Sequence, residues 1–265
     1  MTGVPDFIGG ALVPERWPTF VLVTGRIGGL MLTAPGWSGT TLPATVRTAV
    51  TVVLALVLLP IAPAVVLPAQ VLDLPLPMAA EIAIGVVIGL AAAVLVQAVG
   101  LAGEVVSMQM GLSIAPALAP VPEMQVVGLG QISTLLAILI YLLLGGHLML
   151  IRALGDSLRM LPPGGGIAFT AGGPAATALA GQLFSCAASA AGPVMVALLL
   201  TNIALAVLSR AVPQINAMTV SFPITIGVGL FMFAVSLPNV SAVVARWVQE
   251  LPTGVEGLLI PFQPH

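Results

Sequence analysis

A serine and a histidine could together perform covalent chemistry in this chain. Ser38 lies in the string Gly36-Trp37-Ser38-Gly39, and His147 follows in a later apolar segment. A serine nucleophile with a histidine base inside a membrane is the arrangement of intramembrane serine proteases. Ser38, however, stands in a loop between Pro35 and Pro43, where a Gly/Pro turn is the simpler interpretation. We therefore expect His147 to be a hydrogen-bonded helix residue or one near the lipid headgroups, rather than a proton relay.

The acidic residues suggest structural roles. Glu81 and Glu104 flank an apolar segment, and we expect them to mark its two ends rather than to form an ion site. Asp156 lies at helical spacing from Arg152 and Arg159, which predicts a local salt-bridge cluster. A single cysteine permits neither an intrachain disulfide nor a thiolate metal cage. Nucleotide-binding and metalloprotease motifs are absent from the sequence, so we predict no cofactor, metal or catalytic site.

Charge-free runs dominate the chain. Hydrophobic residues make up 59% of it and charged residues 6%, whereas soluble domains carry about 25% charged residues. Between Glu123 and Arg152 lie 28 residues without a formal charge, and about 20 mainly apolar residues allow a helix to cross a bilayer. We therefore predict an all-α, polytopic membrane protein. The net charge of −2 provides no basic face for nucleic acid.

The elements that must position these residues are six apolar segments, at about residues 19–34, 44–64, 78–103, 126–154, 175–208 and 217–237. We expect a kink at Gly192-Pro193 in the fifth segment and an interruption at Pro223 in the sixth. From Asn239 onward, apolar residues recur at helical spacing, which predicts a short amphipathic or partner-facing helix. If all six segments span, the distribution of arginines weakly favours both termini in the cytoplasm.

Small residues predict where helices approach closely. Gly25 and Gly29 in the first segment have small-xxx-small spacing, and Gly85 and Gly89 share one face of the third. Residues 108–122 are a different feature, because three prolines are interleaved there with small and apolar residues. Irregular backbone at membrane depth must be buried in protein or line a cavity. Such a loop suits a seal that closes a pore and can yield, although an ordinary connector is the alternative.

Four groups of residues occur in an order and spacing that characterise one family. They are Arg26-Ile27 with Pro43 and Arg47; Gly103-Glu104 through Pro120; Gly146-His147-Leu148 through Pro162; and Asn202 through Arg210, Pro213-Gln214 and Phe222-Pro223. Over about residues 26–237 the chain resembles the FliR family of flagellar biosynthetic proteins. Residues 213–223 are also similar to the hairpin of FliQ-type proteins, the small partners of that family.

The resemblance implies a structural and gating subunit of a type III secretion export gate, without catalysis of its own. It implies stacked helical hairpins: a FliP-like part at residues 1–161, a Gly/Pro connector at 162–174, a FliQ-like hairpin at 175–238 and a tail at 239–265. The implied partners are FliP-like and FliQ-like membrane subunits, FlhB-like and FlhA-like export proteins, membrane lipid and unfolded secreted proteins. The implied location is the bacterial inner membrane, at the flagellar basal body.

The same resemblance assigns roles to residues. The family's pore plug maps onto the loop after Met110, with the residues Met108, Met110, Gly111, Ser113, Ile114, Pro116, Leu118, Pro120 and Pro122. Structural positions of the family motifs map onto Arg26, Arg47, Glu104, His147, Arg210, Pro213, Gln214 and Pro223.

The plug departs from the family pattern, because Ile114, Leu118 and Ala119 replace its usual phenylalanines and aspartate. We therefore expect closure by aliphatic packing over a smaller area. An injectisome subunit of the same family is the first alternative to a flagellar one, but its usual motif differs from residues 106–111. A rhomboid-like serine protease and a transporter with broken helices are the others.

Overall fold

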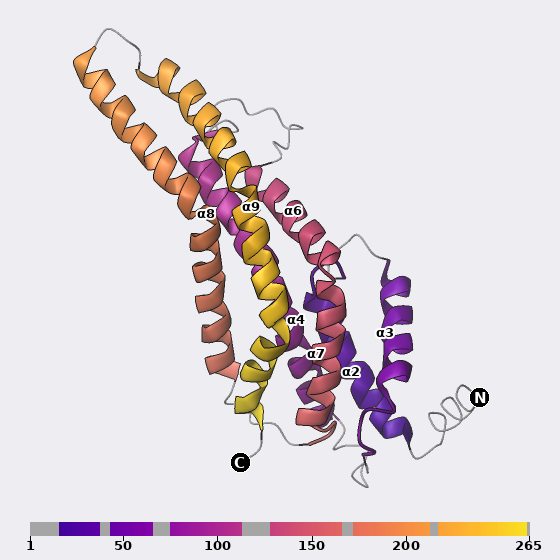
Figure 1. Ribbon diagram of the computed structural model, residues 1–265. Helices are drawn as coiled ribbons and strands as arrows, with labels where there is room; N and C mark the ends of the chain where they lie inside the picture. Colours follow the sequence, from indigo (N-terminus) through magenta and orange to yellow (C-terminus); the bar gives the residue numbers. More distant parts are fainter. Residues whose placement is uncertain are drawn as a thin grey trace. The chain divides into compact units, whose positions relative to one another are not determined.

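The computed structural model describes residues 16–37, 43–65, 75–112, 128–165, 172–212 and 217–263, and these residues are helical with short connections. The helices are α2 (Trp17–Thr33), α3 (Ala44–Leu58), α4 (Pro75–Gln109), α6 (Leu129–Leu143), α7 (Gly146–Met160), α8 (Gly172–Ala211) and α9 (Ala217–Leu259), followed by the short 3₁₀ helix η5 (Ile260–Phe262) (Figure 1). The prediction of an all-α, polytopic membrane protein is confirmed.

Three described helices, α4, α8 and α9, are long and apolar enough to cross a membrane, and the broken pair α6 and α7 provides a fourth if it is one span. By contrast, α2 has 17 residues and α3 has 15, fewer than the roughly 20 that a perpendicular span needs. Each predicted apolar segment is thus helical, but the segments are not six equivalent spans.

The fourth predicted segment is wrong as a single element. A break at Leu144 and Gly145 divides it into α6 and α7. Gly145 has φ 73° and ψ 23°, the left-handed conformation that glycine adopts without the cost of a Cβ contact. A charge-free run does not reveal such a break, because hydropathy is blind to backbone conformation.

The predicted separate helix after Asn239 is also wrong. Helix α9 runs for 43 residues from Ala217 to Leu259 and contains Pro223 and Pro238 without ending at either. Its apolar stripe continues through Val244, Val248 and Leu251, all of which are buried, so packing favours one continuous helix over two. In α8, Pro193 likewise lies inside the helix.

The chain forms two compact units. Unit 1 comprises Met1–Val94, Gly145–Ala180 and Val248–His265, and unit 2 comprises Leu95–Leu144 and Gly181–Trp247. Helices α4, α8 and α9 each contribute residues to both units. The division into a FliP-like part and a FliQ-like hairpin stays a prediction from the resemblance.

Candidate functional site

Within unit 1, α2 and the first part of α4 approach each other along a row of glycines. A Cβ atom on Gly29 would collide with the carbonyl oxygen of Ile82, and one on Gly85 with the carbonyl oxygen of Arg26. Gly89 faces Thr33 in the same way. This is the close contact that the small-residue spacing predicts, since backbones can meet only where side chains are missing.

The close contact places Arg26 of α2 beside Glu81 of α4. The Arg26 side chain is 0% exposed, and its Nε donates to Glu81 Oε2 at 2.6 Å. Its Nη1 donates to the carbonyl oxygen of Ser157 at 2.9 Å and to Ser157 Oγ at 3.2 Å. Its Nη2 donates to the carbonyl oxygen of Leu161 at 2.8 Å. All three guanidinium nitrogens therefore donate a hydrogen bond.

The carboxylate is satisfied on both sides as well. Glu81 Oε1 accepts a hydrogen bond from the backbone N–H of Gly164 at 3.0 Å. The side chain of Glu81 is 2% exposed. A buried carboxylate is costly unless it is paired and hydrogen-bonded, and here both of its oxygens have donors.

This charge cluster, Arg26 with Glu81, Ser157, Leu161 and Gly164, ties α2, α4, α7 and the turn after α7 together. Helix α7 ends at Met160 with Leu161 as its C-cap, so the guanidinium lies at the negative end of the helix dipole. It is a second donor to the carbonyl of Ser157, which also accepts from the Leu161 N–H, and it donates to the carbonyl of Leu161 just beyond the helix. Arg26 is thus a C-cap supplied by another helix. It fixes where α7 ends and where the following turn begins.

The ion pair is a feature that the sequence interpretation missed. Glu81 was expected to mark the end of an apolar segment rather than to join Glu104 in an ion site. The end position is wrong, because α4 begins at Pro75 and Glu81 is buried. The available signal was Arg26, the one charged residue within the apolar segment at 19–34. An ionisable residue in such a segment requires a partner.

In unit 2, the structure describes the beginning of the predicted plug. Met108 is 58% exposed, whereas Met110 is 1% exposed. Helix α4 ends at Gln109, and Gly111 follows with φ 77°, a left-handed residue typical of helix ends. A Cβ on Gly111 would lie 2.7 Å from the ring of Phe222, and one on Gly229 would lie 2.6 Å from Met110 Cγ. The start of the predicted plug therefore packs tightly against α9.

The remaining predicted plug residues, Ser113, Ile114, Pro116, Leu118, Pro120 and Pro122, lie outside the described residues, as do Pro213 and Gln214. Their positions stay predictions.

Comparison with known proteins identifies the family. Residues 17–251 match the family described as bacterial export proteins, family 1. The chain belongs to this family. The match spans nearly all described helices, so both units are part of the export protein fold.

Curated relatives of this export protein carry the name flagellar biosynthetic protein FliR. The protein of Escherichia coli (strain K12) is 30% identical over 225 residues, which cover 85% of this chain and 84% of the relative. That of Caulobacter vibrioides is 27% identical over 232 residues, covering 87% and 92%. That of Pectobacterium carotovorum is 36% identical over 160 residues, covering 60% of each. The FliR-type assignment from the sequence motifs is confirmed.

The other motif residues of this export protein occupy different environments. Glu104, Arg210 and Pro223 are exposed, whereas Arg47 and His147 are half-buried. His147 is the second residue of α7, and its Nδ1 is buried without a hydrogen-bond partner among the described residues. The expected hydrogen bond is therefore not made by that nitrogen. Nothing in the structure explains its orientation.

Of the salt-bridge cluster predicted around Asp156, the pair with Arg159 is confirmed, whereas no ion pair with Arg152 forms among the described residues. Arg159 Nη1 lies 3.5 Å from Asp156 Oδ1, an exposed pair at i,i+3 spacing. Ser38 lies outside the described residues, so no geometry supports its pairing with His147. Among the residues that the structure describes, no group of three or more His, Cys, Asp or Glu side chains could hold a metal ion.

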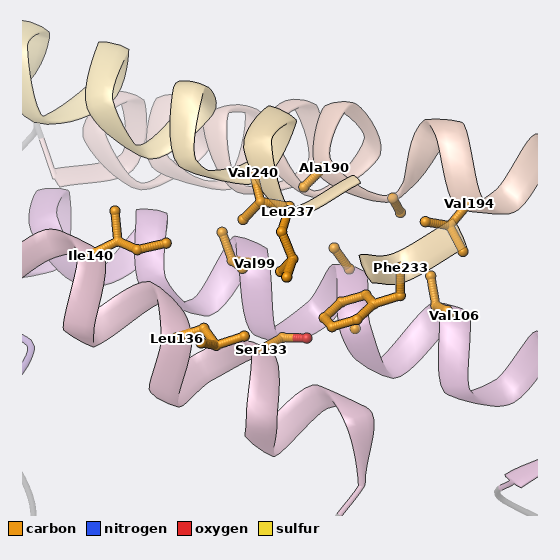
Figure 2. Close-up of a pocket in the computed structure, with 13 residues that line it drawn as sticks. Val99, Val106, Ser133, Leu136, Ile140, Ala190, Val194, Phe233, Leu237 and Val240 are labelled. Atoms are coloured by element: carbon orange, nitrogen blue, oxygen red, sulfur yellow. The ribbon is translucent and has the colours of Figure 1, made fainter. Parts of the chain in front are cut away.

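Unit 2 also contains a small cavity of about 20 Å³ between α4, α6, α8 and α9. Figure 2 shows Phe233 and Leu237 of α9 opposite Ser133 and Leu136 of α6. Ser133 Oγ donates to the carbonyl oxygen of Leu129 at 2.8 Å. A buried water needs two to four polar partners, which this lining does not offer. The cavity is therefore an apolar packing gap and not a site for a polar ligand.

Proposed function

We propose that this chain is a structural and gating subunit of the flagellar type III export gate. It assembles with FliP-like and FliQ-like subunits into a membrane channel for unfolded flagellar proteins, with FlhB-like and FlhA-like export proteins as further partners. The observation that carries the proposal is the family match over residues 17–251. The proposed location is the bacterial inner membrane at the flagellar basal body, and the proposed role involves no catalysis by this subunit.

The uncovered apolar surface of the long helices supports assembly. In α8 and in α9, only 17% of the most apolar 18-residue stretch is buried, whereas in α4 the buried share of that stretch is 61%. Large apolar side chains on them are exposed, among them Leu199, Leu200, Val207, Phe231 and Val235. Exposed apolar patches of this extent are covered by lipid or by other proteins. Helices in an assembled gate would be covered by neighbouring subunits.

Residues 111–122 are proposed to plug the closed channel. The support is the motif resemblance together with the tight packing of Met110 and Gly111 against α9, which gives the loop a fixed starting point. The side chains expected in the plug are aliphatic, so the seal depends on non-directional apolar contact. Such a seal opens for a passing polypeptide more readily than one held by ion pairs.

Deletion of residues 113–121 tests the plug. In cells that also express the partner subunits, we expect the complex to assemble in normal amount but to leak ions and small solutes. The measurement is dye or potassium efflux from vesicles that contain equal amounts of assembled complex, with the wild-type complex as the control. Unchanged permeability would disprove the plug assignment. Loss of the partner subunits on purification would instead count against this loop as a local seal.

A further inference from the structure

Met110, the residue that follows α4, packs over a glycine of α9 within unit 2. Met110 is 1% exposed, and Gly229 is buried as well. A Cβ on Gly229 would lie 2.6 Å from Met110 Cγ, 2.7 Å from its Sδ and 3.0 Å from its Cε. Three successive atoms of the methionine therefore occupy space that exists only because residue 229 has no side chain.

A second contact lies two turns earlier on the same face of α9. Phe222 precedes Gly229 by seven residues, a spacing that returns to one helix face. A Cβ on Gly111 would lie 2.7 Å from Phe222 Cε1 and 3.2 Å from its Cδ1. Gly111 also has φ 77°, a conformation that glycine adopts without strain. Met110 and Gly111 therefore each have a close contact on one face of α9.

Backbone hydrogen bonds tie these two residues to the last turn of α4. The N–H of Met110 donates to the carbonyl oxygen of Val106 at 3.0 Å, and the N–H of Gly111 donates to that of Met108 at 3.0 Å. The left-handed Gly111 then ends the helix, and Leu112 is the last residue described before the loop. A displacement of Met110 therefore moves the point at which the loop begins.

We propose that Gly229 and Phe222 are positioning residues for the seal of the closed channel. They act through Met110 and Gly111, because the fit of these residues against α9 sets where the loop leaves α4. The inference rests on the proposed plug and adds two residues of another helix to it. The contacts are apolar, so their specificity comes from complementary shape rather than from directional bonds.

The fit is sensitive to a single methyl group. Methionine adapts to irregular space by rotating its outer bonds, but the atom nearest to the position of a Gly229 Cβ is Met110 Cγ, which lies close to the backbone. Rotation about the outer bonds leaves Cγ in place. A methyl group at residue 229 therefore displaces the whole Met110 side chain or the backbone that carries it, and either change removes the fit.

The test is Gly229→Ala in the full protein, expressed with its partner subunits. Overpacking predicts that potassium efflux from vesicles, per assembled complex, rises about threefold or more. Gly227→Ala is the matched control, because it makes the same change in α9 at an exposed position where a Cβ meets nothing within 4 Å. Its efflux should equal that of the wild type. Phe222→Leu removes the ring from Gly111 and keeps an apolar side chain, so we expect a smaller rise.

Two combined variants separate positioning from a general structural effect. Met110→Ala removes the atoms that a methyl group at residue 229 would meet, so the Gly229→Ala complex should leak less when it also carries Met110→Ala. In a protein that lacks residues 113–121, Gly229→Ala should add nothing to the leak, because residues that act through one another have non-additive effects.

Wild-type efflux from both the Gly229→Ala and the Phe222→Leu complexes would overturn the proposal. So would a leak that Met110→Ala does not reduce, or one that adds fully to the leak of the deletion, because both results indicate a general loosening of unit 2. If Gly229→Ala prevents recovery of the complex, the efflux of the Phe222→Leu complex decides.

These results separate the positioning role from the plug. A leaking deletion of residues 113–121, together with wild-type efflux from both α9 variants, would reject the positioning role and leave the proposed gate function intact. A deletion that does not leak would instead reject the plug itself.

Discussion

In unit 1 a guanidinium and a carboxylate are fully buried, whereas the buried residues of unit 2, among those described, include no charged side chain. Arg26 and Glu81 have directional partners, and each hydrogen bond fixes one helix relative to the next. The interior of unit 2 is mainly apolar around a small cavity, with Phe233 in its lining. Directional bonds specify one geometry, and apolar contacts tolerate several.

The difference suggests different mechanical roles within a gate subunit. A buried ion pair cannot be opened gradually, because each partner is costly when it stands alone. Apolar contacts have no directional partners to lose, so an apolar core tolerates repacking at lower cost. Unit 1 is therefore suited to a fixed framework, and the interior of unit 2, where the predicted plug begins, is suited to adjustment.

Breaking the ion pair should have the largest effect on stability. Arg26→Ala or Glu81→Ala leaves an uncompensated buried charge, and we expect a loss of about 3–5 kcal/mol in the free energy of unfolding. Denaturant unfolding of the purified protein in detergent measures this. The control is Arg159→Ala, which breaks the exposed pair with Asp156 and should cost about 1 kcal/mol or less.

The double variant Arg26→Leu with Glu81→Leu sharpens the argument. Because it removes both charges, it should be more stable than either single alanine variant. If both single variants unfold at the wild-type denaturant concentration, the charge cluster does not hold unit 1 together.

Overpacking the close contact between α2 and α4 should have the next largest effect on stability. Gly29→Ala forces a methyl group against the carbonyl of Ile82, and we expect a loss of about 1–3 kcal/mol from overpacking. Gly28→Ala is the matched control one residue away, because a Cβ there meets nothing within 4 Å. It should raise stability by up to about 1 kcal/mol, since alanine is the better helix former.

Comparing the melting temperatures of these two variants decides whether contact or propensity dominates. A Gly29→Ala protein as stable as the Gly28→Ala protein would show that the helices can separate without cost.

Sequence reasoning reached the elements governed by local pattern. Apolar runs locate helices, and Gly25, Gly29, Gly85 and Gly89 indicate a close contact, because spacing along one helix determines which residues share a face. It did not reach the pairing of Arg26 with Glu81, which are 55 residues apart in the chain and meet only after two helices have packed. It also missed the break at Gly145, because left-handed backbone there has no signature in hydropathy.

The continuity of α9 is a third example. Proline has a strong local effect, and Pro223 suggested an interruption in the sixth apolar segment. A long apolar stripe that packs on neighbours outweighs the loss of one hydrogen bond at each proline. Similarly, Glu104 was expected to be only an end marker, and its environment depends on glycines of α6 that the sequence alone does not bring beside it.

Filling the cavity should have the smallest effect and tests the apolar side of the comparison. Ala191 lines the cavity, and Ala191→Val adds two methyl groups where there is about 20 Å³ of free space. We expect a gain of no more than about 1 kcal/mol in the free energy of unfolding. The cavity holds only part of the added side-chain volume, so overpacking offsets part of the gain from apolar burial. Ala188→Val, at an exposed position of the same helix, controls for the lower helix propensity of valine.

If unit 2 is adaptable, Ala191→Val is tolerated and denaturant unfolding shows a stability at or above that of Ala188→Val. A loss as large as that of Gly29→Ala would mean that the interior of unit 2 is as rigidly packed as the glycine contact of unit 1, and the contrast between the two units would not hold.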